Sequence, residues 1–371
     1  MKAKVSDIIR IMAEIAPPAM AEDWDNVGLQ VGSKEWPVKK IWISLDPLLE
    51  VVDKGCRAGV DLIITHHPLF FRPVKKIDFS GRLGTIIQLA SQHQTAVFSA
   101  HTNLDSAGGG LNDFFAEKLN LKNLEVLDFL HRALSCKLVV YVPPEYEGKV
   151  MNALFEAGAG KIGPYSCCSF RSEGIGTFLP GSESRPFTGR KGAFTEVPEL
   201  RIETVVEREN LARVLDAAKR CHPYESMAYD VFPLDTPVTW GLGRIGQPEA
   251  PVSFDRFVKE VKKRLGLATV KISGHPGLQV QKVAVCTGSG SGLMKSFLAS
   301  SAQVYVSGDL HYHDARAAEE ADRALIDIGH FASENIVVDL LAERIGKAVQ
   351  LRDLDVTVEP CKLEKDPFTL C

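Results

Sequence analysis

Short apolar runs alternate with amphipathic stretches through the first 126 residues. The apolar runs have the length of strands, and the segments between them carry apolar residues at helical spacing. Strands that are apolar throughout and separated by helices are typical of an α/β sheet covered on both faces. The predicted strands are Val27–Val31, Ile41–Leu45, Asp61–Thr65 and Ala96–Ala100, and the predicted helices are Leu48–Ala58, Arg82–His93 and Leu111–Leu119.

The pattern changes near residue 127 and predicts a separate α+β domain. A polar Gly/Ser-rich loop is expected over residues 181–197, within a β-α-β-β-(β)-α-β order that is typical of a ferredoxin-like unit. Because this unit lies inside the chain, residues 127–235 are predicted to be an inserted domain. Its predicted strands are Lys137–Val142, Ser166–Ser172, Gly176–Leu179, Leu200–Val206 and Met227–Phe232, and its helices are Glu145–Ala157 and Glu209–Lys219.

The α/β pattern returns over residues 236–371. The segments 1–126 and 236–371 are therefore expected to form one α/β core around the insert. The strands predicted in the second segment are Lys282–Cys286, Val304–Val306 and Ala324–Ile328, and the helices are Phe254–Leu265, Leu293–Ser300, His311–Ala321 and one that begins near Ala332 or Ser333 and ends at Arg344.

Composition places the chain among soluble globular proteins, since 45% of its residues are hydrophobic and 24% are charged. No apolar run reaches the roughly 18 residues of a membrane span, and the first apolar residues are helically spaced, so we expect a cytoplasmic protein. A net charge of −4 gives no basic footprint, so direct binding to nucleic acid is not expected. The eight cysteines form no C-x-x-C pair, which favours reduced, structural thiols.

Candidate metal ligands gather where predicted strands end. His66 and His67 follow one buried strand, and Pro68 ends it, so both imidazoles can face one site. A second strand is followed by His101 and Asp105. A carboxylate there can bridge cations, although Asp105 as a helix cap, His101 as a packed polar residue and hydrogen-bonded histidines are alternatives.

His330 and Glu334 follow a third strand and lie four residues apart, where they share one face of a helix. Favourable placement of a carboxylate at a helix N-terminus is the alternative explanation for Glu334. Five of these residues at one sheet edge, namely His66, His67, Asp105, His330 and Glu334, together indicate a metal site that supports hydrolysis.

Four further segments carry polar residues with open roles. Asp309, His311 and His313 follow another strand and are candidate outer partners, proton carriers or substrate contacts, with a helix cap as the alternative. The Gly-rich residues 286–292 lie between a strand and a helix, where a tight turn is favoured over a phosphate cradle. Turns are also favoured for Asp25–Asn26 and for the segment His222–Glu225.

In their order along the chain, the motifs WDNVGLQVG, ITHHPLFF, SAHTNLD, SGDLHYHDA and DIGHFASE resemble the Nif-three-like family (NGG-interacting-factor-three-like), whose members are often labelled GTP cyclohydrolase I type 2. The resemblance implies a mixed-sheet α/β core with a dinuclear metal site, assembled into a homohexamer that is a trimer of dimers. It implies that residues 127–235 are a PII-like insert. Carried over residue by residue, the metal ligands are His66, His67, Asp105, His330 and Glu334.

Two functions follow as hypotheses. The first is a hydrolase of a nucleotide or related small molecule, with GTP cyclohydrolase activity as the case that the family implies. A metal-activated hydroxide would be the nucleophile, Glu334 would bridge two divalent ions, and His101 or His313 would carry protons. Imidazole and carboxylate ligands admit Zn, Mn, Fe, Co or Ni, with zinc the metal most expected to be found. The second is a metal-binding or regulatory scaffold without enzymatic activity.

Overall fold

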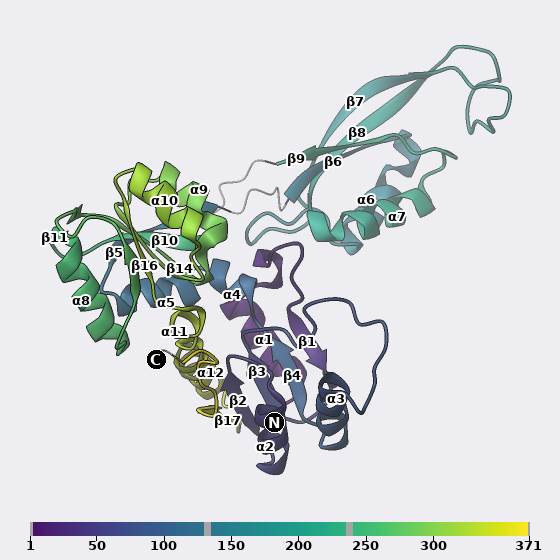
Figure 1. Ribbon diagram of the computed structural model, residues 1–371. Helices are drawn as coiled ribbons and strands as arrows, with labels where there is room; N and C mark the ends of the chain where they lie inside the picture. Colours follow the sequence, from purple (N-terminus) through teal and green to yellow (C-terminus); the bar gives the residue numbers. More distant parts are fainter. Residues whose placement is uncertain (1–2, 130–134, 235–239, 370–371) are drawn as a thin grey trace. The chain divides into compact units, whose positions relative to one another are not determined.

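The computed structural model describes residues 3–129, 135–234 and 240–369 (Figure 1). The chain divides into two compact units. One combines residues 1–130 with residues 238–371, and the other spans residues 131–237. The predicted domain boundary after residue 126 falls within a strand, Lys122–Phe129, and the one at residue 235 lies outside the described residues.

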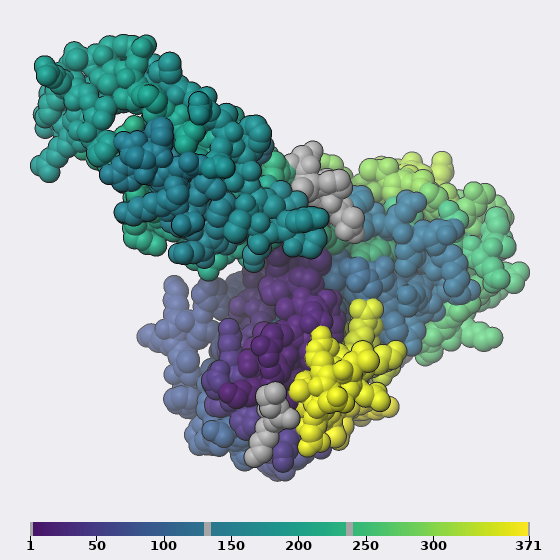
Figure 2. Space-filling view, turned by 180° about the vertical axis from the view of Figure 1, so that it is seen from behind, coloured from purple at the N-terminus to yellow at the C-terminus, as the bar shows by residue number. Residues whose placement is uncertain are grey.

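The first sheet of the larger unit has the strand order β1-β4-β3-β2-β17. Strands β2 (Lys40–Ser44), β3 (Leu62–Thr65) and β4 (Ala96–Ser99) are parallel, as is β17 (Thr357–Pro360), and β1 (Gly28–Val31) runs antiparallel to β4. Figure 2 shows the C-terminal residues, in yellow, lying against the N-terminal ones, in purple, as the pairing of β17 with β2 requires.

Helices cover both faces of this sheet. On one face, α1 (Val5–Ile15) and α12 (Val337–Leu351) pack with β2 and β3 in a core that includes Ile8, Ile41 and Leu341. On the other face lie α2 (Leu49–Arg57) and α3 (Arg82–Gln92). Strands β3 and β4 are fully buried, which explains why they are apolar at every position.

The second sheet has the order β12-β16-β15-β14-β10-β5. Three of its strands are parallel, and the outer three pair antiparallel, so the unit is a mixed α/β structure, as predicted. Helices α5 and α8 pack on one face, and α9 and α10 on the other. The strands are β5 (Lys122–Phe129), β10 (Gly241–Gln247), β12 (Lys271–Ser273), β14 (Val283–Ser289), β15 (Val304–Gly308) and β16 (Ala324–Asp327), and the helices are α5 (Leu111–Lys118), α8 (Phe254–Leu265), α9 (Met294–Ala299) and α10 (Tyr312–Glu320).

A buried arginine ties this sheet to the segment that carries Asp105. Arg244 of β10 is only 3% exposed and donates to both carboxylate oxygens of Asp113, at 2.9 and 2.7 Å. Its guanidinium also donates to the carbonyls of Gly241, Gly243 and Ala107. Ala107 directly follows α4 (Thr102–Ser106), so this network holds the end of the helix in place.

The unit of residues 131–237 has its own core. Its described elements follow the order β-α-β-β-α-β, and the strands form one antiparallel sheet of order β7-β8-β6-β9. Helices α6 and α7 pack on one face over residues such as Leu138, Leu154 and Ile202 (Figure 1). The elements are β6 (Ser135–Val142), α6 (Glu147–Glu156), β7 (Ser169–Phe178), β8 (Thr195–Glu207), α7 (Leu211–Cys221) and β9 (Tyr229–Pro233).

Several sequence predictions need correction. The two strands expected at 166–172 and 176–179 are one continuous strand, β7, because Gly174 and Gly176 stay paired with β8 instead of breaking the chain. The helix expected to begin near residue 332 begins at His330 as α11 (His330–Glu334), and Gly329, at φ +85°, precedes it. The sequence pattern did not predict β5, β10, β12 or β17.

Two further expectations concern cysteines and membranes. All seven cysteines in the described part of the chain are free thiols. Within the same described ranges, no helix is both long enough and apolar enough to cross a membrane.

Candidate metal centre

Polar side chains from both sheets of the larger unit converge on one point. His66 and His67 directly follow β3, His101 follows β4 by two residues, and Asp105 lies in α4. From the other sheet, α11 follows β16 and supplies His330 and Glu334. Each of these segments lies beyond the carboxyl end of a parallel strand, where open α/β sheets bind their ligands.

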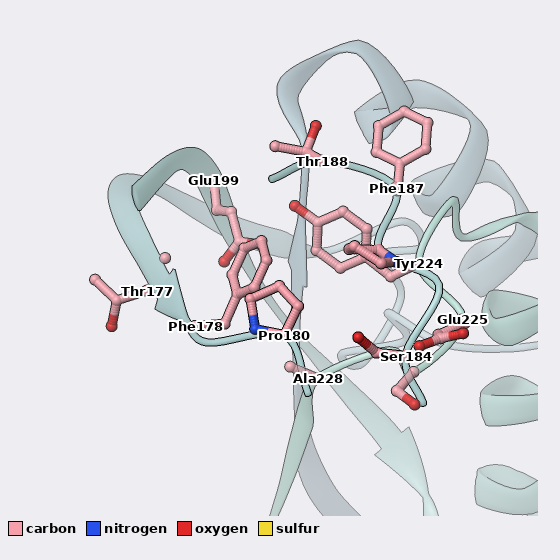
Figure 3. A pocket seen from close by; sticks show the side chains of 13 residues that line it. Thr177, Phe178, Pro180, Ser184, Phe187, Thr188, Glu199, Tyr224, Glu225 and Ala228 are labelled. Carbon is pink, nitrogen blue, oxygen red and sulfur yellow. The ribbon is translucent and has the colours of Figure 1, made fainter. Parts of the chain in front are cut away.

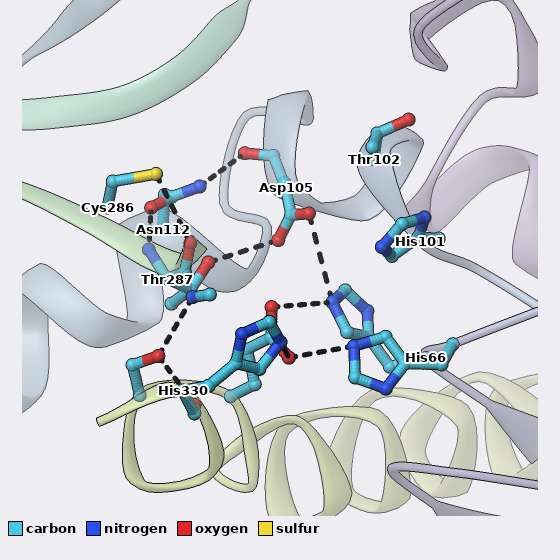
Figure 4. Close-up of polar contacts among 12 residues, drawn as sticks. His66, His101, Thr102, Asp105, Asn112, Cys286, Thr287 and His330 are labelled. Carbon is cyan, nitrogen blue, oxygen red and sulfur yellow. Dashed lines mark hydrogen bonds and ion pairs between the residues drawn. The ribbon is translucent and has the colours of Figure 1, made fainter. Parts of the chain in front are cut away.

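Figure 4 shows His66, His101, Asp105 and His330 converging on one point, and Glu334 contacts three of the cluster's imidazoles. Its Oε2 is 2.9 Å from Nε2 of His67 and 2.9 Å from Nε2 of His330, and its Oε1 is 3.7 Å from Nε2 of His66. Asp105 Oδ2 is 3.8 Å from the same His66 nitrogen. The structure therefore brings together all five residues that the sequence singled out as ligands.

Glu334 and the four imidazoles of the cluster fall into two overlapping groups with the spacing of metal ligands, and Asp105 belongs to neither group. One group is His66, His67 and His101, and the other is His67, His330 and Glu334. Within each group the ligand atoms lie within 4.8 Å of one another. His67 belongs to both groups, so the two positions adjoin.

Every histidine of the cluster is oriented by a bond on its outer nitrogen. The Nδ1–H groups donate to the carbonyl of Ala100 (from His66, 2.8 Å) and to carboxylates of Asp46 (from His67, 2.9 Å), Asp25 (from His101, 2.9 Å) and Asp309 (from His330, 2.7 Å). Such carboxylate and carbonyl partners keep the proton on Nδ1, so each Nε2 becomes free to bind a metal when its own proton is displaced. Imidazoles held in this orientation are suited to be metal ligands.

Two buried atoms of the cluster lack a hydrogen-bond partner within the described residues, namely His66 Nε2 and Glu334 Oε2. The two short imidazole contacts of Glu334 Oε2 therefore lack the alignment of hydrogen bonds. A buried polar atom left without a partner costs about 1–3 kcal/mol, so native proteins rarely keep one without a reason. Cations bound beside these atoms would satisfy both, and the donor set fits divalent metals.

The electrostatics of the cluster favour a cation. Burial raises the pKa of Glu334, but the imidazoles of His330, His66 and His67 outweigh it and hold that pKa well below its usual value. Burial opposes protonation of His67, yet the carboxylates of Asp46 and Glu334 raise its pKa to about 10. Without a metal, the cluster therefore holds its positive charge as protons, and a divalent ion would displace them.

Gly288 makes room for the central carboxylate. Its φ is +67°, and a Cβ built there would lie 2.1 Å from Glu334 Oε1. Its N–H donates to Ser333 Oγ at 2.8 Å. The neighbouring Thr287 donates its hydroxyl to Asp105 Oδ1 at 3.1 Å. The Gly-rich segment 286–292, for which the sequence favoured a tight turn, leads from β14 into a short 3₁₀ helix and supports both carboxylates.

Two exposed aromatic side chains border the cluster. Trp24 and Phe71 have ring centroids 5.7 Å apart, and each lies 5.9 Å from the ring of His101. They are 59% and 57% exposed.

The segment Asp25–Asn26, for which a turn was favoured, also orients His101, because Asp25 accepts the hydrogen bond from its Nδ1–H.

The structure separates the remaining predicted residues. His101, predicted as a proton carrier, lies among the ligand atoms. His313 is exposed on α10, packs edge-on against Tyr312 and belongs to neither ligand group found in the described chain. In the other unit, His222 donates to the carbonyl of Tyr141 at 2.8 Å.

Sequence reasoning missed Asp46 and Asp25 as orienting partners. Asp46 lies just past the end of β2, the same edge that carries His66 and His67, so its position was a usable signal. Asp25 precedes β1, and nothing in the local pattern connects it with His101, which lies 76 residues later in the sequence.

The comparisons with known proteins agree with one another. A curated relative from Bacillus subtilis (strain 168), named "GTP cyclohydrolase 1 type 2 homolog", is 39% identical over 98% of this chain and 97% of its own. One from Mycobacterium tuberculosis with the same name is 36% identical over 99% and 98%.

Solved structures show the same fold. A Bacillus cereus protein related to NIF3 is 36% identical, with a TM-score of 0.70 over 100% of both chains. Staphylococcus aureus protein SA1388 is 28% identical, with a TM-score of 0.77 over 100% of this chain and 99% of its own. The profile of the family Duf34/NIF3 (NGG1p interacting factor 3) matches residues 3–367. The chain therefore belongs to the Duf34/NIF3 family.

Proposed function

We propose that this protein is a hydrolase of a nucleotide or related small molecule and that it depends on two divalent metal ions. One observation carries the proposal: four oriented imidazoles surround a buried carboxylate, and two of the facing atoms have no hydrogen-bond partner in the described chain. The relatives named GTP cyclohydrolase 1 type 2 homolog support the substrate class.

The two ligand groups suggest how the ions would be held. His66 and His101 would face one ion, and His67 and His330 would face the other. Glu334 could supply an oxygen to each position, since Oε1 lies near His66 and Oε2 lies near His67 and His330. Asp105 would complete the first position from beside His66. Bound divalent ions would supply Lewis-acid activation of water and of a substrate oxygen. Imidazole and carboxylate donors admit Zn, Mn, Fe, Co or Ni.

The residues of the chain would position the substrate and the ligands. Asp25, Asp46 and Asp309 would orient their imidazoles and keep the proton on Nδ1, which leaves Nε2 for the metal. The exposed rings of Trp24 and Phe71 would offer stacking faces for a planar base beside His101. We assign His101 to the ligands and not to proton transfer, because it belongs to the first ligand group.

The test is metal content together with turnover. We expect about two divalent ions per chain by mass spectrometry, lost in Glu334→Gln and His66→Ala and kept in the exposed control His313→Ala. The metal-loaded wild type should hydrolyse a purine nucleotide, measured as released formate or phosphate. Full turnover in a variant whose metal positions are empty would refute the mechanism.

A scaffold role is the second candidate, and the separate core of residues 131–237 favours it. We propose that this unit is a PII-like insert, which its β-α-β-β-α-β order supports, and that the chain forms a homohexamer, a trimer of dimers, as the family resemblance implies. If the metal-loaded protein has the mass of a hexamer in solution and hydrolyses no nucleotide, the scaffold role is favoured.

A further inference from the structure

A cavity of about 260 Å³ lies within the unit of residues 131–237, and none of its lining residues belongs to the candidate metal centre (Figure 3). It lies between the residues that follow β7 and the turn that follows α7. Its walls include Phe178, Pro180, Phe187, Glu199, Tyr224 and Glu225. Its volume is somewhat below the roughly 300 Å³ at which pockets for drug-sized molecules begin, so its ligand is small.

Aromatic rings form the main walls. The centroid of Tyr224 lies 6.0 Å from that of Phe187 and 6.5 Å from that of Phe178. Figure 3 shows the Tyr224 ring in the middle of the cavity wall, with its hydroxyl directed to the side where Glu199 and Phe178 lie. Phe187 also packs edge-on against Tyr146 at 5.7 Å. Because the rings already pack against one another, their negative faces are in place before a ligand binds.

Tyr224 is held from behind by His222. The backbone N–H of Tyr224 donates to His222 Nδ1 at 3.2 Å, and the two rings pack edge-on at 5.0 Å. The Nε2–H of His222 donates to the carbonyl of Tyr141. Burial and the Glu199 carboxylate raise the pKa of Tyr224, so its hydroxyl remains a neutral donor at physiological pH.

The charge that lines the cavity is negative. Glu199 and Glu225 both contribute, and no Lys, Arg or His is among the lining residues. Neither carboxylate has an ion-pair partner in the described part of the chain, and the Oε1 of Glu225 accepts only a neutral backbone N–H, from Arg185 at 2.9 Å. Gly176 leaves space for Glu199, because a Cβ there would lie 2.2 Å from Glu199 Oε2.

We propose that this cavity binds a small organic cation, an ammonium or guanidinium group on a short apolar or aromatic body. Aromatic faces attract a cation through their quadrupoles, and a partly buried carboxylate without a counter-ion adds a direct charge partner. The same carboxylates repel phosphates and other anions, so the cavity selects against nucleotides. This proposal does not depend on the function proposed for the candidate metal centre.

The test measures the binding of three probes of similar shape to the full-length chain by calorimetric titration. The probes are 2-phenylethylammonium, the neutral 2-phenylethanol and the anion 3-phenylpropionate. We expect the ammonium to bind at least about tenfold more tightly than the alcohol, and the anion not to bind. Equal binding of ammonium and alcohol, tighter binding of the anion, or no binding of any probe up to about 10 mM would overturn the proposal.

Two variants localise the binding. Glu199→Gln keeps the size of the side chain and should lower the affinity for the ammonium probe about tenfold. Glu196 is an exposed glutamate on the same strand outside the cavity, so Glu196→Gln should leave that affinity unchanged. If Glu199→Gln impairs folding, Phe187→Leu serves instead, because it keeps an apolar wall and removes a ring face. Phe187→Leu should lower the affinity for the ammonium more than the affinity for the alcohol, and an equal loss of affinity for both would contradict the proposal.

Discussion

Replacing Gly288 by alanine would place a methyl group where the Glu334 carboxylate now lies. The Cβ would be 2.1 Å from Oε1, whereas ordinary contacts begin at 3.4 Å, and it would lie 3.1 Å from Cδ of the same side chain. The carboxylate must therefore move by about 1 Å. Disturbing the support of a metal ligand typically lowers metal affinity by about 10- to 100-fold. We expect the affinity of the cluster for divalent metal to fall by about that factor.

Backbone strain must be separated from this clash. At φ +67°, alanine in the left-handed region costs about 1–2 kcal/mol wherever it occurs. Gly266 has the same φ of +67° and no atom within 4 Å of its would-be Cβ, so Gly266→Ala reports the strain alone. Gly292 lies in the same Gly-rich segment with open space around it, so Gly292→Ala reports neither effect.

The assay is competition with a metal-binding dye, together with metal content after gel filtration and thermal melting with and without added zinc. Gly266→Ala should melt at a lower temperature with an unchanged metal affinity, and Gly292→Ala should match the wild type. Gly288→Ala should lose both stability and metal. Wild-type metal affinity in Gly288→Ala, or the same loss of affinity in Gly266→Ala, would refute the argument that Gly288 positions Glu334.

Three further predictions concern other contacts. Asp46→Asn leaves His67 without its orienting carboxylate and should weaken metal binding about 10- to 100-fold by the same dye competition, with circular dichroism unchanged. Arg244→Met leaves the Asp113 carboxylate partly buried and unpaired, so urea unfolding should show a loss of about 3–5 kcal/mol, and a loss below about 1 kcal/mol would count against a structural role. Burial lowers the pKa of His222, so the unfolded state takes up a proton first as the pH falls. The stability of residues 131–237, measured by hydrogen exchange, should therefore decrease below about pH 6.5, and His222→Gln should flatten that dependence.

Local sequence signals identified most of the residues of the candidate metal centre. Adjacent His66 and His67 end a strand that is apolar at every position, and such a strand must be buried with its carboxyl end at the ligand-binding edge of the sheet. The four-residue spacing of His330 and Glu334 placed them on one helical face, and the helix that forms there starts at His330 itself. These inferences hold because each depends only on the periodicity of one element.

Only the tertiary structure decided how these elements meet. Asp25 and His101 lie on segments with no shared pattern, and their contact exists because β1 pairs with β4. Strand β17 reaches the first sheet from the far end of the chain, and its short partly exposed pattern gives no sign of a partner. The role of Gly288 also depends on packing, since the sequence showed a glycine in a turn and the fold brought the Glu334 carboxylate against it. Long-range pairing is a property of many weak contacts formed together, and no window of the sequence contains it.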